Sequence, residues 1–155
     1  MDFRICALPR AEFEPYFAMT DAELHRHGAR RCRADRQPGY PCRVSLEDAR
    51  VGEPMLLLHY EHQAVSTPYR SSHAIYVREC ATQALPKTNE VPQMLRLRLL
   101  SVRAFDRDGM MLDADVVEGR ELEPVLERLL SLDGAAYLHL HNARPGCYAA
   151  RVDRI

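Results

Sequence analysis

Apolar and polar residues alternate along much of this chain. A two-residue period is typical of β-strands, because successive side chains of a strand point to opposite faces. The segment 54–60 differs, since it is apolar on both faces, as in a strand at the centre of a sheet. Asp108-Gly109 separates two alternating segments and predicts a hairpin turn. The pattern predicts strands at residues 3–7, 29–33, 54–60, 73–79, 99–105, 110–117, 136–141 and 147–153.

Helical periodicity and end signals predict four short helices. Thr20 and Glu23 have the spacing of a capping box and Gly28 is a natural stop, so we expect a helix between them. Pro92 suits the first turn of a second helix, and residues 11–17 predict a third. The fourth helix is predicted by apolar residues three and four positions apart. These residues are Leu122, Val125, Leu126, Leu129 and Leu130.

The order of these elements predicts the fold class. Hairpins outnumber strand–helix–strand units, which favours an α+β fold with a mainly antiparallel sheet and three or four short helices. The chain has 155 residues, and this length fits a single domain over 1–155.

Charge and composition exclude several classes of protein. Lys and Arg number 21 and Asp and Glu 22, so the net charge of −1 gives no bulk attraction to nucleic acid or to an acidic membrane. The longest apolar run, residues 55–58, is far shorter than the ~18 residues of a membrane helix. The first residues alternate too early for a secretory signal. The five cysteines lack C-x-x-C spacing, so we expect free thiols in a reducing cytoplasm.

The last predicted hairpin carries the most distinctive chemistry. If its loop pairs His141 with Cys147, then Leu140 lies opposite Tyr148, Leu138 opposite Ala150 and Ala136 opposite Val152 on an apolar face. The other face then gathers polar and aromatic side chains. These are Tyr137, His139, His141, Cys147 and Arg151.

Several kinds of chemistry are open to this group. Two histidines at i and i+2 of a strand are about 7 Å apart at Cα, so His139 and His141 are candidate ligands of one metal ion. His141 and Cys147 can instead form a thiolate–imidazole pair. Arg151 can hold a carboxylate or phosphate through its planar fork. The alternative is a polar outer face with two exposed histidines.

A polar loop between two core strands is a second candidate. Tyr69, Arg70 and His73 there can supply stacking, contact with an anion and a proton. His73 shares its strand face with Ile75 and Val77, so a buried structural histidine is the alternative.

Other residues carry weaker signals. Arg103 shares a strand face with Phe105, so it requires either an acidic partner or a place in a pocket. Cys42 follows a rigid turn beside Arg43, which can lower the pKa of a thiol, although such a cysteine is more often a small buried hydrophobe. No phosphate-binding glycine loop, dinucleotide motif, H-E-x-x-H or G-x-S-x-G occurs.

Several runs together resemble a known family. They include Pro41-Cys42-Arg43-Val44-Ser45-Leu46, Thr67-Pro68-Tyr69-Arg70, Arg103-Ala104-Phe105-Asp106 and His139-Leu140-His141-Asn142-Ala143. With His73-Ala74-Ile75-Tyr76-Val77-Arg78-Glu79 and Gly146-Cys147-Tyr148, they resemble the bacterial family called domain of unknown function 1203, from Phe3 to Arg154. The resemblance implies a bacterial, cytoplasmic, single-domain protein and implies no catalytic residue.

The leading hypothesis is a pocket that binds a small anionic metabolite. Its expected lining residues are Tyr69, Arg70, His73, His139, His141, Asn142 and Arg151. His141, Cys147 and His73 are the candidate catalytic groups if the protein is an enzyme. The alternatives are a small enzyme that uses a divalent metal or the Cys–His pair, and a structural or interaction protein without a chemical site. The cofactor, the substrate and the oligomeric state stay open.

Overall fold

The computed structural model describes residues 1–155, which divide into two compact units. Unit 1 consists of Met1–Cys6, Glu61–His73 and Pro86–Ile155, and unit 2 of Ala7–Tyr60 and Ala74–Leu85. The two sheets are antiparallel and accompany four α-helices, so the predicted mainly antiparallel α+β class is confirmed. The single domain expected over 1–155 stays a prediction, because two compact units can belong to one domain or to two.

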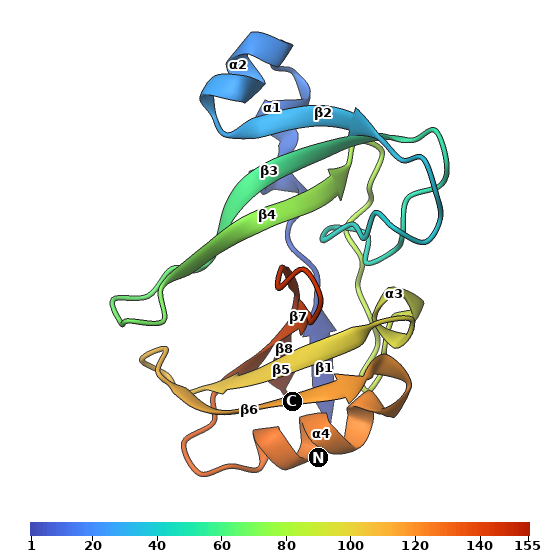
Figure 1. The fold of residues 1–155 in the computed structure, drawn as a ribbon. Coiled ribbons are helices and arrows are strands. Elements are labelled where there is room, and N and C mark those ends of the chain that lie inside the picture. The colour runs from blue at the N-terminus through green and yellow to red at the C-terminus, as the bar shows by residue number, and fades with distance from the viewer. The chain divides into compact units, whose positions relative to one another are not determined.

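Unit 1 is built on a five-stranded sheet (Figure 1). Its strands, in spatial order, are β1 (Phe3–Cys6), β8 (Tyr148–Arg154), β7 (Tyr137–Asn142), β5 (Leu99–Phe105) and β6 (Met111–Glu118). The chain forms α3 (Gln93–Arg96) before β5, and η2 (Gly119–Glu121) follows β6 as a short 3₁₀ helix. The bounds of the five strands agree with the predicted strands to within a few residues, as expected of alternating segments separated by turns.

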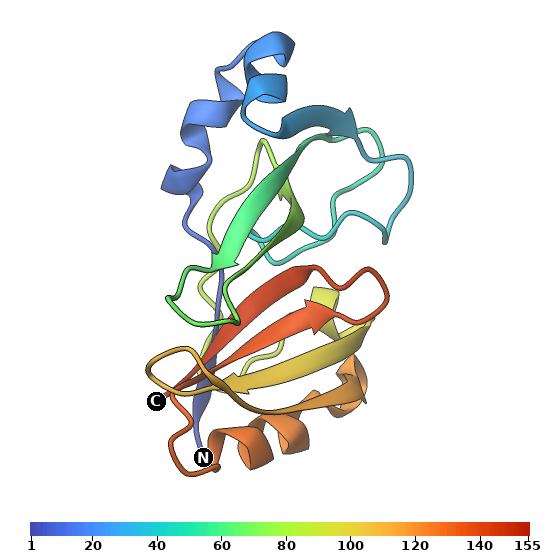
Figure 2. The ribbon, with the colours of Figure 1, turned by 60° about the vertical axis from the view of Figure 1, so that its left-hand side comes forward.

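One face of this sheet is covered by the helix α4 (Leu122–Leu130), as Figure 2 shows. Arg128 of α4 forms ion pairs with Asp113 and Asp115 of β6, so these two aspartates lie on the side of the sheet that α4 covers. The leucines at helical spacing bury their side chains, and so do the residues of β5, β7 and β8 on the same face. These strand residues are Leu100, Val102, Ala104, Leu138, Leu140, Ala150 and Val152. We call this the helix-covered face.

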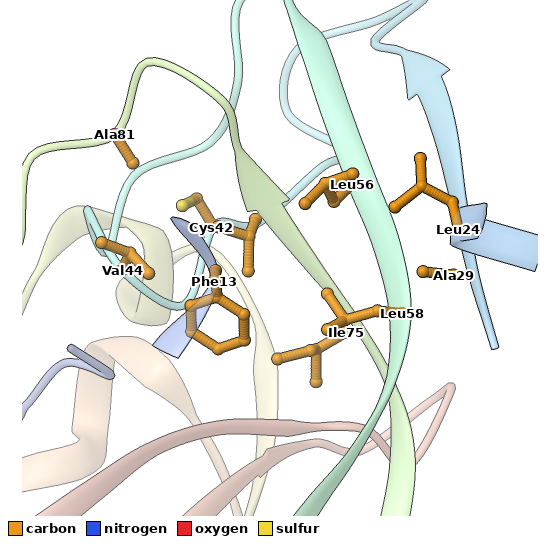
Figure 3. Packing of buried hydrophobic residues seen from close by; sticks show 10 residues of the cluster. Phe13, Leu24, Ala29, Cys42, Val44, Leu56, Leu58, Ile75 and Ala81 are labelled. Atoms are coloured by element: carbon orange, nitrogen blue, oxygen red, sulfur yellow. The ribbon is translucent and has the colours of Figure 1, made fainter. Parts of the chain in front are cut away.

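Unit 2 has its own apolar core beside a three-stranded sheet, in which β2 (Ala29–Arg33), β3 (Pro54–Gln63) and β4 (Ser71–Arg78) are neighbours in that order. The expected capping box is present at the start of α2 (Asp21–Arg26). The backbone amide of Thr20 donates to the carboxylate of Glu23, and the backbone amide of Glu23 donates to the hydroxyl of Thr20. Figure 3 shows the core. It includes Phe13, Leu24, Ala29, Cys42, Val44, Leu56, Leu58, Ile75 and Ala81.

Two predicted elements differ from the structure. Residues 11–17 form a 3₁₀ turn, η1 (Arg10–Glu12), and a separate α1 (Glu14–Phe17), because Pro15 lacks an amide hydrogen and fits only the first turn of a helix. Strand β3 continues through the polar residues to Gln63, where a loop was expected after residue 60. No helix of the structure is long and apolar enough to cross a membrane.

Candidate functional site

The hairpin of β7 and β8 has a different register from the predicted one. His141 lies opposite Tyr148, and Leu140 lies opposite Ala150, with Ala149 as the extra residue of a β-bulge. The predicted pairing of His141 with Cys147 was therefore wrong. The cause lies in the turn, because the amide of Asn142, which was expected in the loop, donates to the carbonyl of Cys147 at 2.9 Å. The pairing therefore continues one residue further into the turn than predicted, and His141 lies opposite Tyr148.

The bulge also redistributes residues between the two faces. Tyr148 was expected opposite Leu140 on the apolar face, and it lies beside His141 instead. The expected pairs of Leu138 with Ala150 and of Ala136 with Val152 were also wrong, because Leu138 pairs with Val152. The apolar residues and the histidines still occupy opposite faces, as expected, since His139 pairs with Arg151.

Three histidines meet on the second face of the five-stranded sheet, and we call His62, His139 and His141 the histidine cluster. His139 and His141 come from β7, and His62 comes from the end of β3 that belongs to unit 1. The ring centroid of His62 lies 4.9 Å from that of His141 and 6.0 Å from that of His139. Tyr148 stacks on His62 with a centroid distance of 5.4 Å.

The cluster buries imidazole nitrogens that make no hydrogen bond. His139 is 3% exposed and His141 is 1% exposed. Nδ1 of His62, Nδ1 of His139 and Nε2 of His141 are buried without a partner. Buried polar groups are normally hydrogen-bonded, so three unpaired nitrogens in one cluster are unusual.

Burial sets the protonation state of the cluster. Desolvation, followed by the positive charge of neighbouring groups that include Arg103, lowers the pKa of His139 and of His141 to about 3 and that of His62 to about 4. In His141, hydrogen bonding to the carbonyl of Gly146 opposes this shift. The three imidazoles are therefore neutral at neutral pH.

Arg103 lies on the same face and has no acidic partner. Its Cα pairs in register with that of His139, and its Nε donates to the Ser101 hydroxyl at 3.2 Å. The side chain is partly buried, and desolvation lowers its pKa. By contrast, Arg151 donates to Asp153 at 2.7 Å and lies 4.0 Å above the ring of Tyr137.

Aromatic side chains continue the face beyond the histidines. Phe105 stacks on Tyr137 with a centroid distance of 5.4 Å, and Tyr69 contacts Phe105 at 6.2 Å. The hydroxyl of Tyr137 exchanges hydrogen bonds with the buried amide of Gln63. This polar pair is satisfied, unlike the histidine cluster.

The structure brings together part of the predicted site. His139, His141 and Arg151 share one face, and Tyr69 reaches it through Phe105. His73 lies beside the last hairpin, because its Nε2 is 3.1 Å from the carbonyl oxygen of Pro145.

Three other predicted residues have different surroundings. Arg70 is 67% exposed at its side chain and forms an ion pair with Glu61 at 3.1 Å. The Nδ2 of Asn142 donates to Sγ of Cys147 at 3.3 Å, and its Oδ1 is buried without a partner. Cys147 pairs along the hairpin with Asn142 instead of lying opposite His141.

Metal ligation was the alternative expected for His139 and His141. Their ring centroids are 6.2 Å apart. The structure contains no group of three or more His, Cys, Asp or Glu side chains placed to hold one metal ion.

Sequence reasoning missed His62 and placed Tyr148 on the wrong face. A signal for His62 was present, since Leu58, Tyr60 and His62 continue the two-residue period of β3. The period was obscured because residues 61–63 are polar, which is typical of a loop. Tyr148 had no such signal, because nothing in the local pattern marks which residue of the turn begins the pairing.

These features define a mainly antiparallel α+β protein with a buried histidine cluster beside an arginine that lacks an acidic partner. The family model described as "Protein of unknown function (DUF1203)" matches residues 39–154, so the chain belongs to this family. No curated protein and no solved structure matches the chain.

Proposed function

We propose that the chain binds a small anionic ligand at the histidine cluster, with Arg103 as the cationic group. One observation carries the proposal: Arg103 is a partly buried guanidinium whose hydrogen bond goes to a neutral hydroxyl, that of Ser101. Partial removal of a charge from water without a counter-charge is unfavourable. A bound carboxylate or phosphate supplies that counter-charge through paired hydrogen bonds.

A second arginine of the chain illustrates the ordinary arrangement. Arg78 in unit 2 donates to both carboxylate oxygens of Glu53 at 2.7 Å, and these hydrogen bonds raise its pKa. Arg103 has no such pair, and its pKa is lowered. The contrast supports a ligand as the partner of Arg103.

The neutral histidines support binding of a ligand for a different reason. Imidazoles that carry no charge offer hydrogen bonds to a ligand without adding further buried charge. Tyr69, His73, His139, His141 and Arg151 remain in the proposed site.

His62, Arg103 and Tyr148 join this proposed site. His62 and Arg103 are only partly buried, so the edge of the cluster reaches solvent. We also propose a reducing bacterial cytoplasm as the location of the protein, which the five free cysteines support.

Thermal unfolding in the presence of carboxylates and phosphates tests the proposal. A ligand at about 100 times its Kd stabilises the folded state by about 2.7 kcal/mol, which raises the Tm by roughly 5–10 °C. Arg103→Met is expected to abolish the shift. The control is Arg128→Met, which removes an exposed arginine on the opposite face. A shift that survives Arg103→Met, or no shift with any anion, contradicts the proposal.

A further inference from the structure

We infer that the ligand carries a hydroxyl next to its anionic group and that this hydroxyl donates to Nε2 of His141. This inference rests on the proposed function and narrows the ligand to a chemical class: an oxyanion with its own hydrogen-bond donor. Hydroxycarboxylates and protonated phosphates share this chemistry.

The tautomer of His141 follows from its hydrogen bond. Its Nδ1 lies 3.0 Å from the carbonyl oxygen of Gly146. A carbonyl oxygen only accepts, so Nδ1 carries the hydrogen of the neutral ring. Nε2 of the same ring is then a lone pair that can only accept a hydrogen bond.

No group of the protein supplies a donor to this lone pair. Nε2 of His141 is buried without a partner, and Nδ1 of the neighbouring His62 is equally unpaired. Burial of an acceptor without a donor costs free energy. A ligand hydroxyl that donates to this acceptor removes that cost on binding.

The anionic group and the hydroxyl belong to one ligand because their partners are neighbours. Ser101 pairs in register with His141, and Arg103 pairs with His139 on the same face. Arg103 donates a hydrogen bond to Ser101, and this bond directs its guanidinium toward the Ser101–His141 pair. Four of the five guanidinium hydrogens remain for the anion, since only Nε donates within the protein.

Matched ligand pairs test the inference by calorimetry. Glycolate is compared with acetate and lactate with propionate, because the members of each pair have equal charge and differ in one hydroxyl. Phosphate, at a pH where it keeps a hydroxyl, is compared with sulfate, which has none. We expect the hydroxylated member to bind about 10- to 100-fold more tightly. A preference in the carboxylate pairs indicates a hydroxycarboxylate, and a preference in the phosphate pair alone indicates a phosphate.

The outcomes separate this inference from the proposed function. Equal affinity within every pair overturns the hydroxyl contact and leaves anion binding intact. Absence of binding for all probes overturns the anion site itself, and the inference with it.

A variant of His141 tests whether the preference for hydroxylated ligands depends on its Nε2 atom. His141→Asn keeps an amide donor near the position of Nδ1, where it can reach the Gly146 carbonyl, and deletes the Nε2 acceptor. The affinity difference within each pair is expected to fall to less than about threefold. In the wild-type protein, the ¹⁵N resonance of His141 Nε2 should move toward the position of a protonated nitrogen with glycolate and stay in place with acetate. An unmoved resonance with both overturns the inference without any variant.

Discussion

The two faces of the five-stranded sheet bury side chains of the same strands in opposite ways. On the helix-covered face, Leu138 and Leu140 of β7 are fully buried among apolar residues. On the other face, His139 and His141 of the same strand are almost as buried, yet they leave nitrogens unpaired.

The difference separates burial that stabilises from burial that costs stability. An apolar side chain contributes about 25 cal/mol for each Å² removed from water. A buried polar atom without a partner costs roughly 1–3 kcal/mol. Such a cost in a folded protein is typical of a site whose partner is a ligand, because binding sites give up stability for function.

The largest expected effect is on the helix-covered face. Leu138→Ala removes a fully buried side chain and leaves a cavity, so the free energy of unfolding should fall by about 2–5 kcal/mol in urea denaturation. The matched control is Leu112→Ala on β6, where the side chain is 41% exposed and the loss should stay under about 1 kcal/mol. Similar losses at both positions would contradict the view that burial on the helix-covered face stabilises the fold.

Acid should destabilise the protein through the histidine cluster. The folded-state pKa values of about 3 to 4 lie below the ordinary value of 6.5, so below pH 6.5 the unfolded chain binds more protons than the folded one. The free energy of unfolding is therefore unaffected by these histidines above pH 6.5, and it decreases as the pH falls from 6.5 toward 4. Urea denaturation should show a loss of up to about 1.4 kcal/mol per pH unit over this range for each histidine that stays neutral in the folded protein.

Double substitution His139→Phe with His141→Phe should flatten this slope. Arg103, Arg151 and His73 also face the cluster, but their charges oppose its protonation in the folded state, so they deepen the slope without causing it. An unchanged slope in the double variant would assign the acid sensitivity to other groups.

A smaller effect, of opposite sign, is expected for His139→Phe alone. The ring of His139 contacts Phe105, Tyr137 and Tyr148, and its Nδ1 makes no hydrogen bond. An apolar ring should therefore leave the free energy of unfolding unchanged or raise it by about 1 kcal/mol at pH 7.

Tyr137→Phe provides the contrast on the same face. It removes the partner of the buried Gln63 amide and should cost about 1–3 kcal/mol. A greater loss for His139→Phe than for Tyr137→Phe would contradict the view that the imidazole is unsatisfied.

The smallest effect is expected for Arg70→Ala. The side chain is 67% exposed and its ion pair with Glu61 is screened by water, so the free energy of unfolding should change by less than about 0.5 kcal/mol. Anion affinity, measured by calorimetry, should stay within about threefold of the wild type. A tenfold loss of affinity would restore Arg70 to the binding site.

Local signals were sufficient for most of the fold. The capping box of Thr20 and Glu23, the Asp108-Gly109 turn and the leucine spacing of α4 all predicted elements that the structure contains. These signals succeed because caps, turns and periodicity depend on residues within a few positions of one another.

The candidate site was only partly predictable from the sequence. His139, His141 and Arg151 were placed on one face, since alternation along a strand is local. His62 was missed because β3 extends through polar residues that sequence reasoning assigns to a loop. Cys147 was expected beside His141, but it pairs with Asn142 at the turn and Tyr148 lies opposite His141.

The sequence by itself determined the elements, the antiparallel class and the separation of leucines from histidines on the last hairpin, because each depends on short-range periodicity. Only the tertiary structure decided which side chains meet. A single extra residue in a strand moves the side chains that follow to the other face, and nothing in the local pattern marks where that residue falls. Two further features also depend on residues far apart in the sequence. His62 of β3 contacts His141 of β7, and no acidic side chain lies near Arg103.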